Sequence, residues 1–467
     1  MRTLLYTLAL LSGAALVAQE RPDLRLADNK YGFFDNDLLS PAFHREKRAE
    51  LRRWLPAKGM AVLFANPVRN RSNDVDFEYH QDPNLYYLTG LREPNAVLIV
   101  FKDSVELIGR RTNELLVVQE RDPRTEVWNG YRLGTEGAEE MLGVSMAITG
   151  RQFLQLTLPG EGPVLPRRSM ENLTNDPHDK ADLSDLLRHF DATVPEDRMG
   201  EQAHLDEQLA RMREVKHPEE LALMRRAIAI TCDAQTTLMQ ELVPGMTEYQ
   251  TEAIVEYVFK RSGAEHEGFP SIQGGGPHSC VLHYVTNRRS LAKGDLLVSD
   301  IGAEYHGYTA DVTRTLPVNG TFTREQRAIY DLVHAAQQAG IAEVWPGRPF
   351  FAAHQAATEV IAKGLVELGV IDDEKDVRRY FMHGSSHYLG LDVHDAGSYG
   401  PLQVNTVITV EPGIYIPEGA PCDRKWWGIG IRIEDDILVT PGGPENLSRC
   451  VPSRADEVEA LMAGRKG

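Results

Sequence analysis

Cysteine is scarce in this sequence of 467 residues, which contains Cys232, Cys280, Cys422 and Cys450. Four cysteines in a chain of this length do not make a disulfide framework, and none of them forms a CxxC pair. Cys232 falls in a helical pattern and Cys280 in an expected strand, so we predict that both are buried free thiols. A bridge between Cys422 and Cys450 is left open, because the sequence alone does not establish a pairing.

The sequence also lacks a basic block and, after its first residues, a long apolar run. The net charge is -18 and 25% of the residues are charged, which favours a soluble acidic protein and disfavours nucleic acid as a partner. The pairs Arg225-Arg226 and Arg288-Arg289 are too short to change that balance. After the start of the chain, no segment approaches the roughly 20 apolar residues that span a bilayer.

The first 18 residues differ from the rest of the chain and are typical of a secretory signal peptide. Arg2 supplies a positive start, residues 4–17 are mostly apolar, and Ala18 closes a cleavage site before Gln19. Leu16 is an imperfect residue for that site, so the cleavage point stays open. No cysteine is nearby to accept a lipid. We therefore expect export to the periplasm or the exterior, with no membrane attachment after cleavage.

The length of the chain predicts two domains. Residues 19–200 combine apolar runs typical of short strands with amphipathic patterns typical of helices, which indicates a compact α/β domain. We expect strands at 60–64, 96–101 and 114–118, helices at 41–54, near 136–142 and at 181–190, and loops at 159–180 and 195–204. Residues 201–467 form the second and larger domain, which begins with a helix after His217.

A repeat in the second domain predicts a pseudo-symmetric α+β fold. Pro244-Gly245 precedes a helical pattern that ends near Gly263, and Pro346-Gly347 precedes another that ends near Gly369. Two similar halves, each a helix pair with strands, place a site at their junction.

The stretch from residue 294 to 315 predicts a hairpin that carries two carboxylates. An apolar run ends in Asp300, a turn rich in Gly and aromatic residues follows, and a second strand carries Asp311. A two-residue turn at His306-Gly307 would place residue 311 opposite residue 302, with Asp300 diagonal to Asp311 on the same face. Two carboxylates so close repel each other unless a proton or a cation lies between them, and a divalent metal is the commoner solution.

Three later segments supply further metal-ligand types. His383, His387 and His394 lie within twelve residues of one another, but Gly384 replaces the Glu of an H-E-x-x-H zinc helix. Glu411 follows an apolar strand, and Arg432 and Glu434 share one face of another strand. Five donors, Asp300, Asp311, His387, Glu411 and Glu434, form an oxygen-rich set that suits two divalent ions and a hydrolytic water.

These motifs resemble those of the pita-bread metallopeptidases, and most closely the aminopeptidase P family. The resemblance covers residues 300–314, 383–395, 411–413 and 428–436, and residues 71–90 and 121–134 resemble that family's N-terminal domain. It implies an α+β fold, with a smaller α/β N-terminal domain before a pseudo-symmetric pita-bread catalytic domain. It also implies a peptidase that releases the residue before a proline in the second position, by attack of a hydroxide that bridges two metals.

The same resemblance implies individual roles. Asp311 and Glu434 would bridge two ions, usually manganese, with zinc or cobalt as alternatives; Asp300 would complete one ion, and His387 with Glu411 the other. Glu411 also matches the family's general base, and His283 and His394 match its substrate and transition-state histidines. His383 and Arg432 match residues around the proline pocket and the bridging Glu. Asp74 matches a position near the substrate amino terminus, and Trp128 matches a residue that enters a neighbouring subunit's site.

Alternatives remain beside this interpretation. Prolidases share the five ligands and cleave Xaa-Pro dipeptides, and an inactive peptide-binding module on the same fold is a different class of protein. Ser385 stands where close relatives often carry an apolar residue, and the signal peptide is unusual beside cytoplasmic relatives. The family also implies a homo-oligomer, a dimer or a tetramer.

Overall fold

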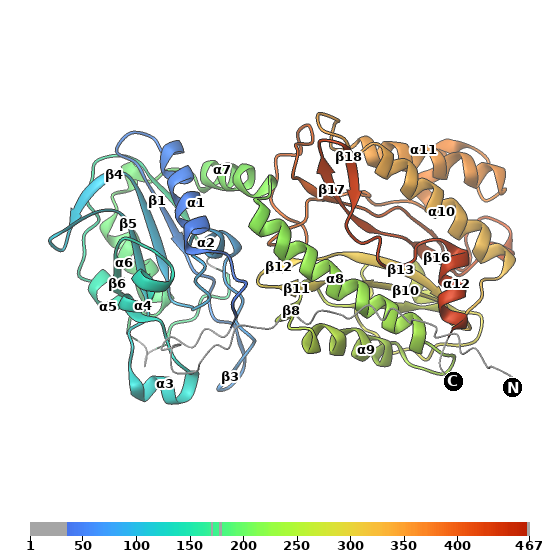
Figure 1. Cartoon of the computed structure of the whole chain (residues 1–467), viewed down its shortest axis with the longest axis horizontal. Coiled ribbons are helices and arrows are strands. Elements are labelled where there is room, and N and C mark those ends of the chain that lie inside the picture. Colours follow the sequence, from blue (N-terminus) through green and yellow to red (C-terminus); the bar gives the residue numbers. More distant parts are fainter. Residues whose placement is uncertain (1–34, 170, 177–179, 465–467) are drawn as a thin grey trace, which may run out of the picture.

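The computed structural model describes residues 35–169, 171–176 and 180–464 of the chain. The predicted signal peptide lies outside these residues. The described chain forms two lobes, which Figure 1 shows side by side, with helices α7 and α8 running from one lobe into the other. Of the helices within the described ranges, none is both long enough and apolar enough to cross a membrane.

The first lobe is built on a five-stranded sheet with the order β6-β5-β4-β1-β7. Its strands are β1 Met60–Phe64, β4 Val97–Leu107, β5 Arg110–Val118, β6 Ala147–Thr149 and β7 Val164–Arg167. Alternate residues of each strand face opposite sides: Ala61 and Leu63 join one apolar cluster with helix α1, while Val62 and Phe64 join another with helix α6. The sheet is therefore covered on both faces.

Helices and a small hairpin complete this lobe: α1 Pro41–Trp54, α2 Pro83–Thr89, α3 Pro123–Asn129, α4 Gly134–Met141, α5 Gly150–Phe153, α6 Leu183–Thr193, η2 Glu196–Arg198, β2 Asn70–Ser72 and β3 Val75–Asp76. The predicted elements at 41–54 and 60–64 are confirmed residue for residue. The predicted loop at 159–180 is wrong over β7, an edge strand that pairs with β1 in parallel although it contains Pro166. An edge strand tolerates proline, because one side of it donates no sheet hydrogen bond.

The second lobe contains two helix pairs with strands between them (Figure 1). The pairs are α8 Pro218–Glu241 with α9 Glu248–Arg261, and α10 Arg324–Ala342 with α11 Ala352–Glu367; α7 Gln202–Glu214 precedes them and α12 Ala455–Ala463 follows. The predicted repeat corresponds to the second helix of each pair. Gly245 and Gly347, in the turns before α9 and α11, both have positive φ, at 97° and 82°. α7 begins inside the segment 195–204 that we predicted to be a loop, so that part of the prediction is wrong.

The strands of this lobe form three three-stranded sheets and one two-stranded sheet. They are β8 His266–Glu267, β9 Ile272–Gly275, β10 Leu296–Ile301, β11 Ala303–Tyr305, β12 Tyr308–Thr309, β13 Val312–Pro317, β14 Val407–Val410, β15 Gly413–Ile416, β16 Ile429–Arg432, β17 Asp435–Thr440 and β18 Gly443–Asn446, with short helices η3 Gly276–Cys280, η4 Glu374–Arg379 and η5 Arg424–Trp426. The orders are β13-β10-β9, β12-β11-β8, β14-β17-β18 and β15-β16.

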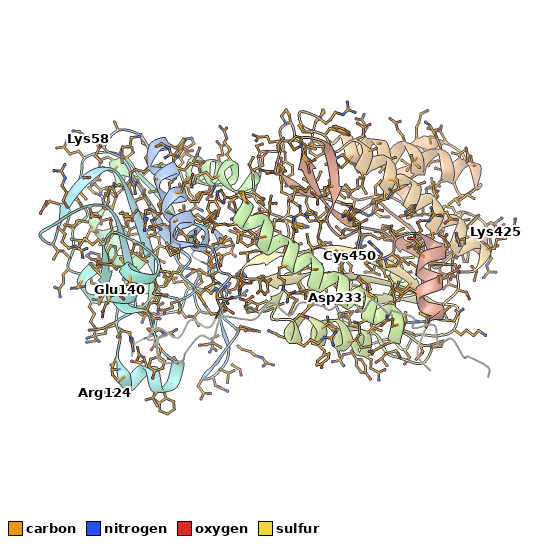
Figure 2. All side chains as sticks on the ribbon, in the orientation of Figure 1. Lys58, Arg124, Glu140, Asp233, Lys425 and Cys450 are labelled. Atoms are coloured by element: carbon orange, nitrogen blue, oxygen red, sulfur yellow. A yellow bond between two sulfur atoms is a disulfide. The ribbon has the colours of Figure 1, made fainter. Side chains whose placement is uncertain are left out.

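The cysteines correct one of our predictions. Cys232 on α8 is joined to Cys450 by a disulfide, with 6.1 Å between their Cα atoms, so it is not a free thiol, and a Cys422–Cys450 bridge is excluded. Figure 2 shows Cys450 beside helix α8. The approach of the chain after β18 to α8 joins residues 218 positions apart, which no local pattern contains. Cys280 and Cys422 are free thiols and half-buried, and Cys280 lies in η3 instead of a strand.

The two lobes meet at the predicted hairpin. Tyr86 of α2 donates its hydroxyl hydrogen to the backbone oxygen of His306 at 2.9 Å, and Tyr87 donates to that of Met212 at 2.7 Å. Arg92 pairs with Glu265 at 3.0 Å. The first lobe therefore buttresses the turn of the hairpin that carries the two aspartates.

Candidate active site

The hairpin has the predicted register. Asp300 on β10 lies opposite Thr313 on β13, and Tyr305 pairs with Tyr308 around the turn. His306 and Gly307 form this turn with φ of 51° and 84°, the positive values that a two-residue hairpin turn of type I′ requires. Asp300 is 7% exposed and Asp311 5% exposed, so both carboxylates lie on rigid, buried backbone.

All five predicted metal donors line one cavity of about 450 Å³. Asp311, His387 and Glu434 each offer a ligand atom, and these atoms lie within 4.8 Å of one another. The His387 Nε2 atom is 3.4 Å from Asp311 Oδ2 and 3.7 Å from Glu411 Oε1. The structure thus brings the four donor-bearing segments of the sequence to one point.

The carboxylates of this cluster have oxygens without a protein partner. Within the described part of the chain, Asp300 Oδ1, Asp311 Oδ1 and Glu434 Oε1 are buried and make no hydrogen bond. An unsatisfied buried oxygen is costly unless a cation or a proton meets it. The donor set therefore fits divalent metal ions, which prefer carboxylate oxygens and imidazole.

The pKa values of the carboxylates agree with a site built for positive charge. Burial, and then the neighbouring charges of Asp300 and Glu411, raise the pKa of Asp311 and of Glu434 well above their ordinary values. Burial also raises the pKa of Glu411 to about 7, although His387 and Arg432 oppose that rise. Without a cation these acids would hold protons, and a bound cation would release them.

His387 is oriented by its backbone contacts. Its Nδ1 atom lies 3.0 Å from the backbone oxygen of Tyr388; because a carbonyl only accepts, Nδ1 carries the proton and Nε2 is free to bind a metal. The amide of His387 donates to Thr409 Oγ1, and the amide of Thr409 donates to the His387 oxygen. This exchange ties the imidazole to β14, the strand that leads into Glu411.

Arg432 orients Asp300. Its guanidinium donates to Asp300 Oδ2 at 2.6 Å and to the Tyr415 hydroxyl at 3.0 Å. Burial opposes the charge, but Tyr415 and Asp300 hold the pKa of Arg432 well above its ordinary value. Thr313 donates its hydroxyl hydrogen to Glu434 Oε2 at 2.7 Å. We had not predicted Tyr415 or Thr313, although each lies within four residues of a predicted ligand.

Besides the donor His387, the histidines His283, His383 and His394 line the same cavity. His383 contacts the Tyr415 hydroxyl through Nε2 at 2.9 Å, and burial together with Arg432 lowers its pKa to about 4. The ring of His394 meets that of His387 edge-on, with centroids 4.4 Å apart. Burial and the neighbouring His387 lower the pKa of His394. The three side chains provide hydrogen-bonding groups beside the donors.

Asp74 and Trp128 are not among the described residues that line the donor cavity. Asp74 is exposed between β2 and β3, and Trp128 on α3 is 85% exposed. Their contribution to a site therefore stays a prediction.

Comparison with known proteins places the chain among peptidases. Residues 222–441 match the model of metallopeptidase family M24, and residues 44–157 match that of the aminopeptidase P N-terminal domain. The Xaa-Pro aminopeptidase of Escherichia coli K12 is 38% identical over 92% of this chain and 100% of its own length; that of Haemophilus influenzae is 37% identical, with 89% and 96% covered.

Solved structures of aminopeptidase P also match this chain. Escherichia coli aminopeptidase P with the inhibitor Pro-Leu matches with a TM-score of 0.81 at 35% identity, covering 91% of this chain and 99% of that one. Pseudomonas aeruginosa aminopeptidase PepP matches with a TM-score of 0.83 at 33% identity, covering 92% and 99%.

The fold and the donor set are those of a family M24 metallopeptidase, a class that works with divalent metal ions. Within this class, the chain belongs to the Xaa-Pro aminopeptidase family. The predicted resemblance, the pita-bread fold class and the metallopeptidase class are thereby confirmed.

Proposed function

We propose that this protein releases the N-terminal residue from peptides that carry proline in the second position. The observation that carries the proposal is the convergence of five metal donors, three of them with buried unpartnered oxygens, in one cavity. The relatives that share this architecture over nearly the whole chain are named Xaa-Pro aminopeptidase.

Two divalent ions complete the site in this proposal. Asp311 and Glu434 would serve both ions, Asp300 would serve one of them, and His387 with Glu411 would serve the other. Manganese is our first choice because the set is rich in carboxylates; zinc or cobalt are alternatives, and a zinc-substituted Escherichia coli aminopeptidase P has been solved. When bound, the ions polarise the substrate carbonyl and lower the pKa of water.

The side chains of the chain handle the proton and the developing charge. Glu411 takes the proton of the attacking water and passes it to the leaving proline nitrogen. His283 and His394 stabilise the oxyanion that forms at the scissile carbonyl. Asp300, held by Arg432, faces the substrate amino group.

Proline is selected by shape and by its missing donor. The cavity that holds the donors is also lined by apolar residues, namely Phe269, Pro270, Ile272, Leu282, Val285 and Val393. Proline carries no N–H after another residue, and its ring fixes φ. An apolar pocket can hold the proline ring, and it needs no hydrogen-bond acceptor because proline has no amide hydrogen to donate. His383 lines the same cavity.

We further propose a homo-oligomer, a dimer or a tetramer, in which Trp128 enters a neighbouring subunit's site and Asp74 lies near the substrate amino terminus. The support is the exposure of Val127, Trp128 and Tyr131, which are 81%, 85% and 70% exposed, because exposed apolar groups of this size mark interaction surfaces. Light scattering of the wild type and of Trp128→Ala tests this; a monomeric wild type would contradict it.

Export is the last part of the proposal. The N-terminal 18 residues support it, and so does the disulfide, because disulfides persist in oxidising compartments and are rare in the cytosol. Fractionation of the native host followed by immunoblotting tests it, and full-length protein confined to the cytoplasm would contradict it.

The substrate proposal is tested with a peptide panel. Rates on Xaa-Pro dipeptides and on longer Xaa-Pro-Yaa peptides separate an aminopeptidase from a prolidase. We expect cleavage of the longer peptides, with Asp311→Asn as the inactive control for contaminating peptidases. Cleavage of dipeptides alone would identify a prolidase, and no cleavage by metal-loaded protein would favour a binding module.

A further inference from the structure

The Cys232–Cys450 disulfide joins helix α8 to the segment after β18, and both of these contact the part of the lobe that carries the metal donors. Cys232 is buried in α8, while Cys450 is exposed in the segment after β18, which Figure 2 shows beside this helix. Residues near Cys232 hold the hairpin of the two aspartates, and residues near Cys450 contact both that hairpin, at Arg314, and the acids that follow Glu434.

On the Cys232 side, helix α8 holds the hairpin of the two aspartates. Thr231 accepts a hydrogen bond from the amide of Ala303 at 2.9 Å. Gln235 donates to the backbone oxygens of Ser299 and Val312, both at 2.9 Å. Ser299 and Val312 are the immediate neighbours of Asp300 and Asp311, so α8 fixes both strands next to their ligands.

On the Cys450 side, the segment 448–452 contacts Arg314, a fully buried residue of the hairpin strand β13. Arg314 donates to the backbone oxygens of Val451 at 3.1 Å and Pro452 at 2.8 Å. It also donates to the backbone oxygen of the donor Glu434 at 2.6 Å. The position of Glu434 is thus linked to the segment that ends at the disulfide.

Ser448 and the acids after Glu434 add a second link. Ser448 donates to Asp435 Oδ1 at 2.6 Å and accepts from the amide of Asp436 at 3.1 Å. Asp436 Oδ2 in turn accepts from the amide of Asp311 at 3.2 Å. The same segment is therefore linked to both Glu434 and Asp311.

We propose that the Cys232–Cys450 disulfide is a positioning element of the metal site, one that clamps the Asp300–Asp311 hairpin to the link between β16 and β17 that carries Glu434. It forms after export, when the two thiols lose two protons and pass two electrons to a protein disulfide donor, which is reduced to its dithiol. The exposed Cys450 is reachable by such a donor. Burial raises the pKa of the Cys280 thiol to about 11, so that cysteine does not compete in thiol exchange.

The inference rests on the proposed function for its meaning, but its test does not depend on peptide cleavage. The comparison is between wild type, the bridge variant Cys232→Ala/Cys450→Ser and the matched control Cys280→Ala/Cys422→Ser. Mn²⁺ affinity is measured by calorimetric titration of metal-free protein, and kcat and KM are measured on an Xaa-Pro-Yaa peptide at limiting and excess Mn²⁺.

We expect the bridge variant to bind Mn²⁺ about ten-fold more weakly, as loss of groups that orient metal ligands typically does. Its kcat at limiting Mn²⁺ should fall and recover in excess Mn²⁺, with KM unchanged, while the control behaves as wild type. An unchanged Mn²⁺ affinity with a lower thermal midpoint would overturn the proposal and leave a purely structural bridge.

Reduction of the wild type provides a second arm if the bridge variant fails to fold. Phosphine reductant should weaken Mn²⁺ binding of wild type by the same factor, with thiol alkylation and mass spectrometry confirming that the bridge has opened. Four alkylatable thiols in unreduced protein from an oxidising compartment would overturn the proposal. Failure of the wild type to cleave any Xaa-Pro peptide would instead refute the proposed function and leave the calorimetric result standing.

Discussion

Asp395 is the centre of a buried ionic cluster, and its removal should cost a large share of the stability. Its side chain is 1% exposed and pairs with the guanidinium of Arg213 and, at 2.8 Å, with the ammonium of Lys216. Burial opposes its charge, but Arg213 and Lys216 hold the pKa of Asp395 below its ordinary value. Arg213 also donates to Asn84 of α2 at 3.0 Å, so the cluster joins the two lobes beside the His394 loop.

The expected loss of unfolding free energy depends on which partners Arg213 and Lys216 keep in Asp395→Ala. Arg213 keeps Asp392 and Asn84 as partners, whereas Lys216 keeps the backbone oxygen of Arg213 as a hydrogen-bond acceptor. Breaking a buried ion pair by removing one partner costs about 3–5 kcal/mol. Because one of the two cations stays partnered, we expect a loss of about 3 kcal/mol, the lower end of that range.

The assay is urea unfolding of metal-free protein, followed by tryptophan fluorescence. Glu445→Ala is the matched control, since Glu445 pairs with Arg225 on the surface, where the side chains are 37% and 45% exposed; such pairs contribute about 0–1 kcal/mol. Asp395→Ala/Lys216→Met should regain part of the loss, because it removes the unpaired charge. If Asp395→Ala lost no more than the control, the account of this cluster would be refuted.

Three further predictions concern the site and the joint between the lobes. Glu411→Gln should lower kcat by about 100-fold or more, the usual effect of losing a general base, with substrate affinity measured by calorimetry retained; retained kcat would exclude Glu411 as the base. Asp311→Asn should lose both metal ions and Asp300→Asn one, as counted by metal analysis after dialysis, and equal loss in both variants would contradict the bridging role. His306→Asn should change how the stability of the protein depends on pH. Burial opposes the charge of His306, but Glu265 and Asp37 raise the pKa of this side chain above 6.5. The contribution of His306 to stability is therefore full below pH 6.5 and is lost as pH rises through the raised pKa. Burial opposes the charge of Glu265, but His306 and Arg92 outweigh it and lower the pKa of this carboxyl from 4.5 to about 2. The contribution of Glu265 to stability is therefore lost as pH falls from 4.5 toward 2. The advantage of wild type over His306→Asn in urea midpoint should therefore shrink as pH rises above 6.5, and a pH-independent difference would refute the ionic account.

The hairpin could be predicted because its geometry is local. Alternation across a strand and a two-residue turn at His306-Gly307 determine which residues face each other, and the structure has that register at Asp300. The predicted helix at 41–54 and strand at 60–64 were likewise set by short apolar periods. β4 extends to Leu107, beyond the predicted 96–101. It pairs with β5 again at residues 105–107, after the polar residues 102–104 interrupt the apolar run that defined the prediction.

The groups behind the donors could not be predicted, because long-range packing places them. Arg314 is buried among backbone oxygens of segments more than a hundred residues away, and nothing in its own neighbourhood distinguishes it from a surface arginine. Tyr415 follows Glu411 by four residues, but its contact with Arg432 depends on the pairing of β15 with β16. The Cys232–Cys450 pairing depends in the same way on where the chain after β18 meets α8.

The central claim is that the cavity is a two-metal site that cleaves before proline. Its most direct test is mass spectrometry of a peptide Xaa-Pro-Yaa-Zaa and its Xaa-Ala-Yaa-Zaa analogue after incubation with metal-loaded, chelated and Mn²⁺-restored protein. The account predicts release of the first residue from the proline peptide alone, loss of cleavage on chelation and recovery with two Mn²⁺ per chain. Cleavage that persists after chelation, or equal cleavage of the alanine peptide, would contradict it.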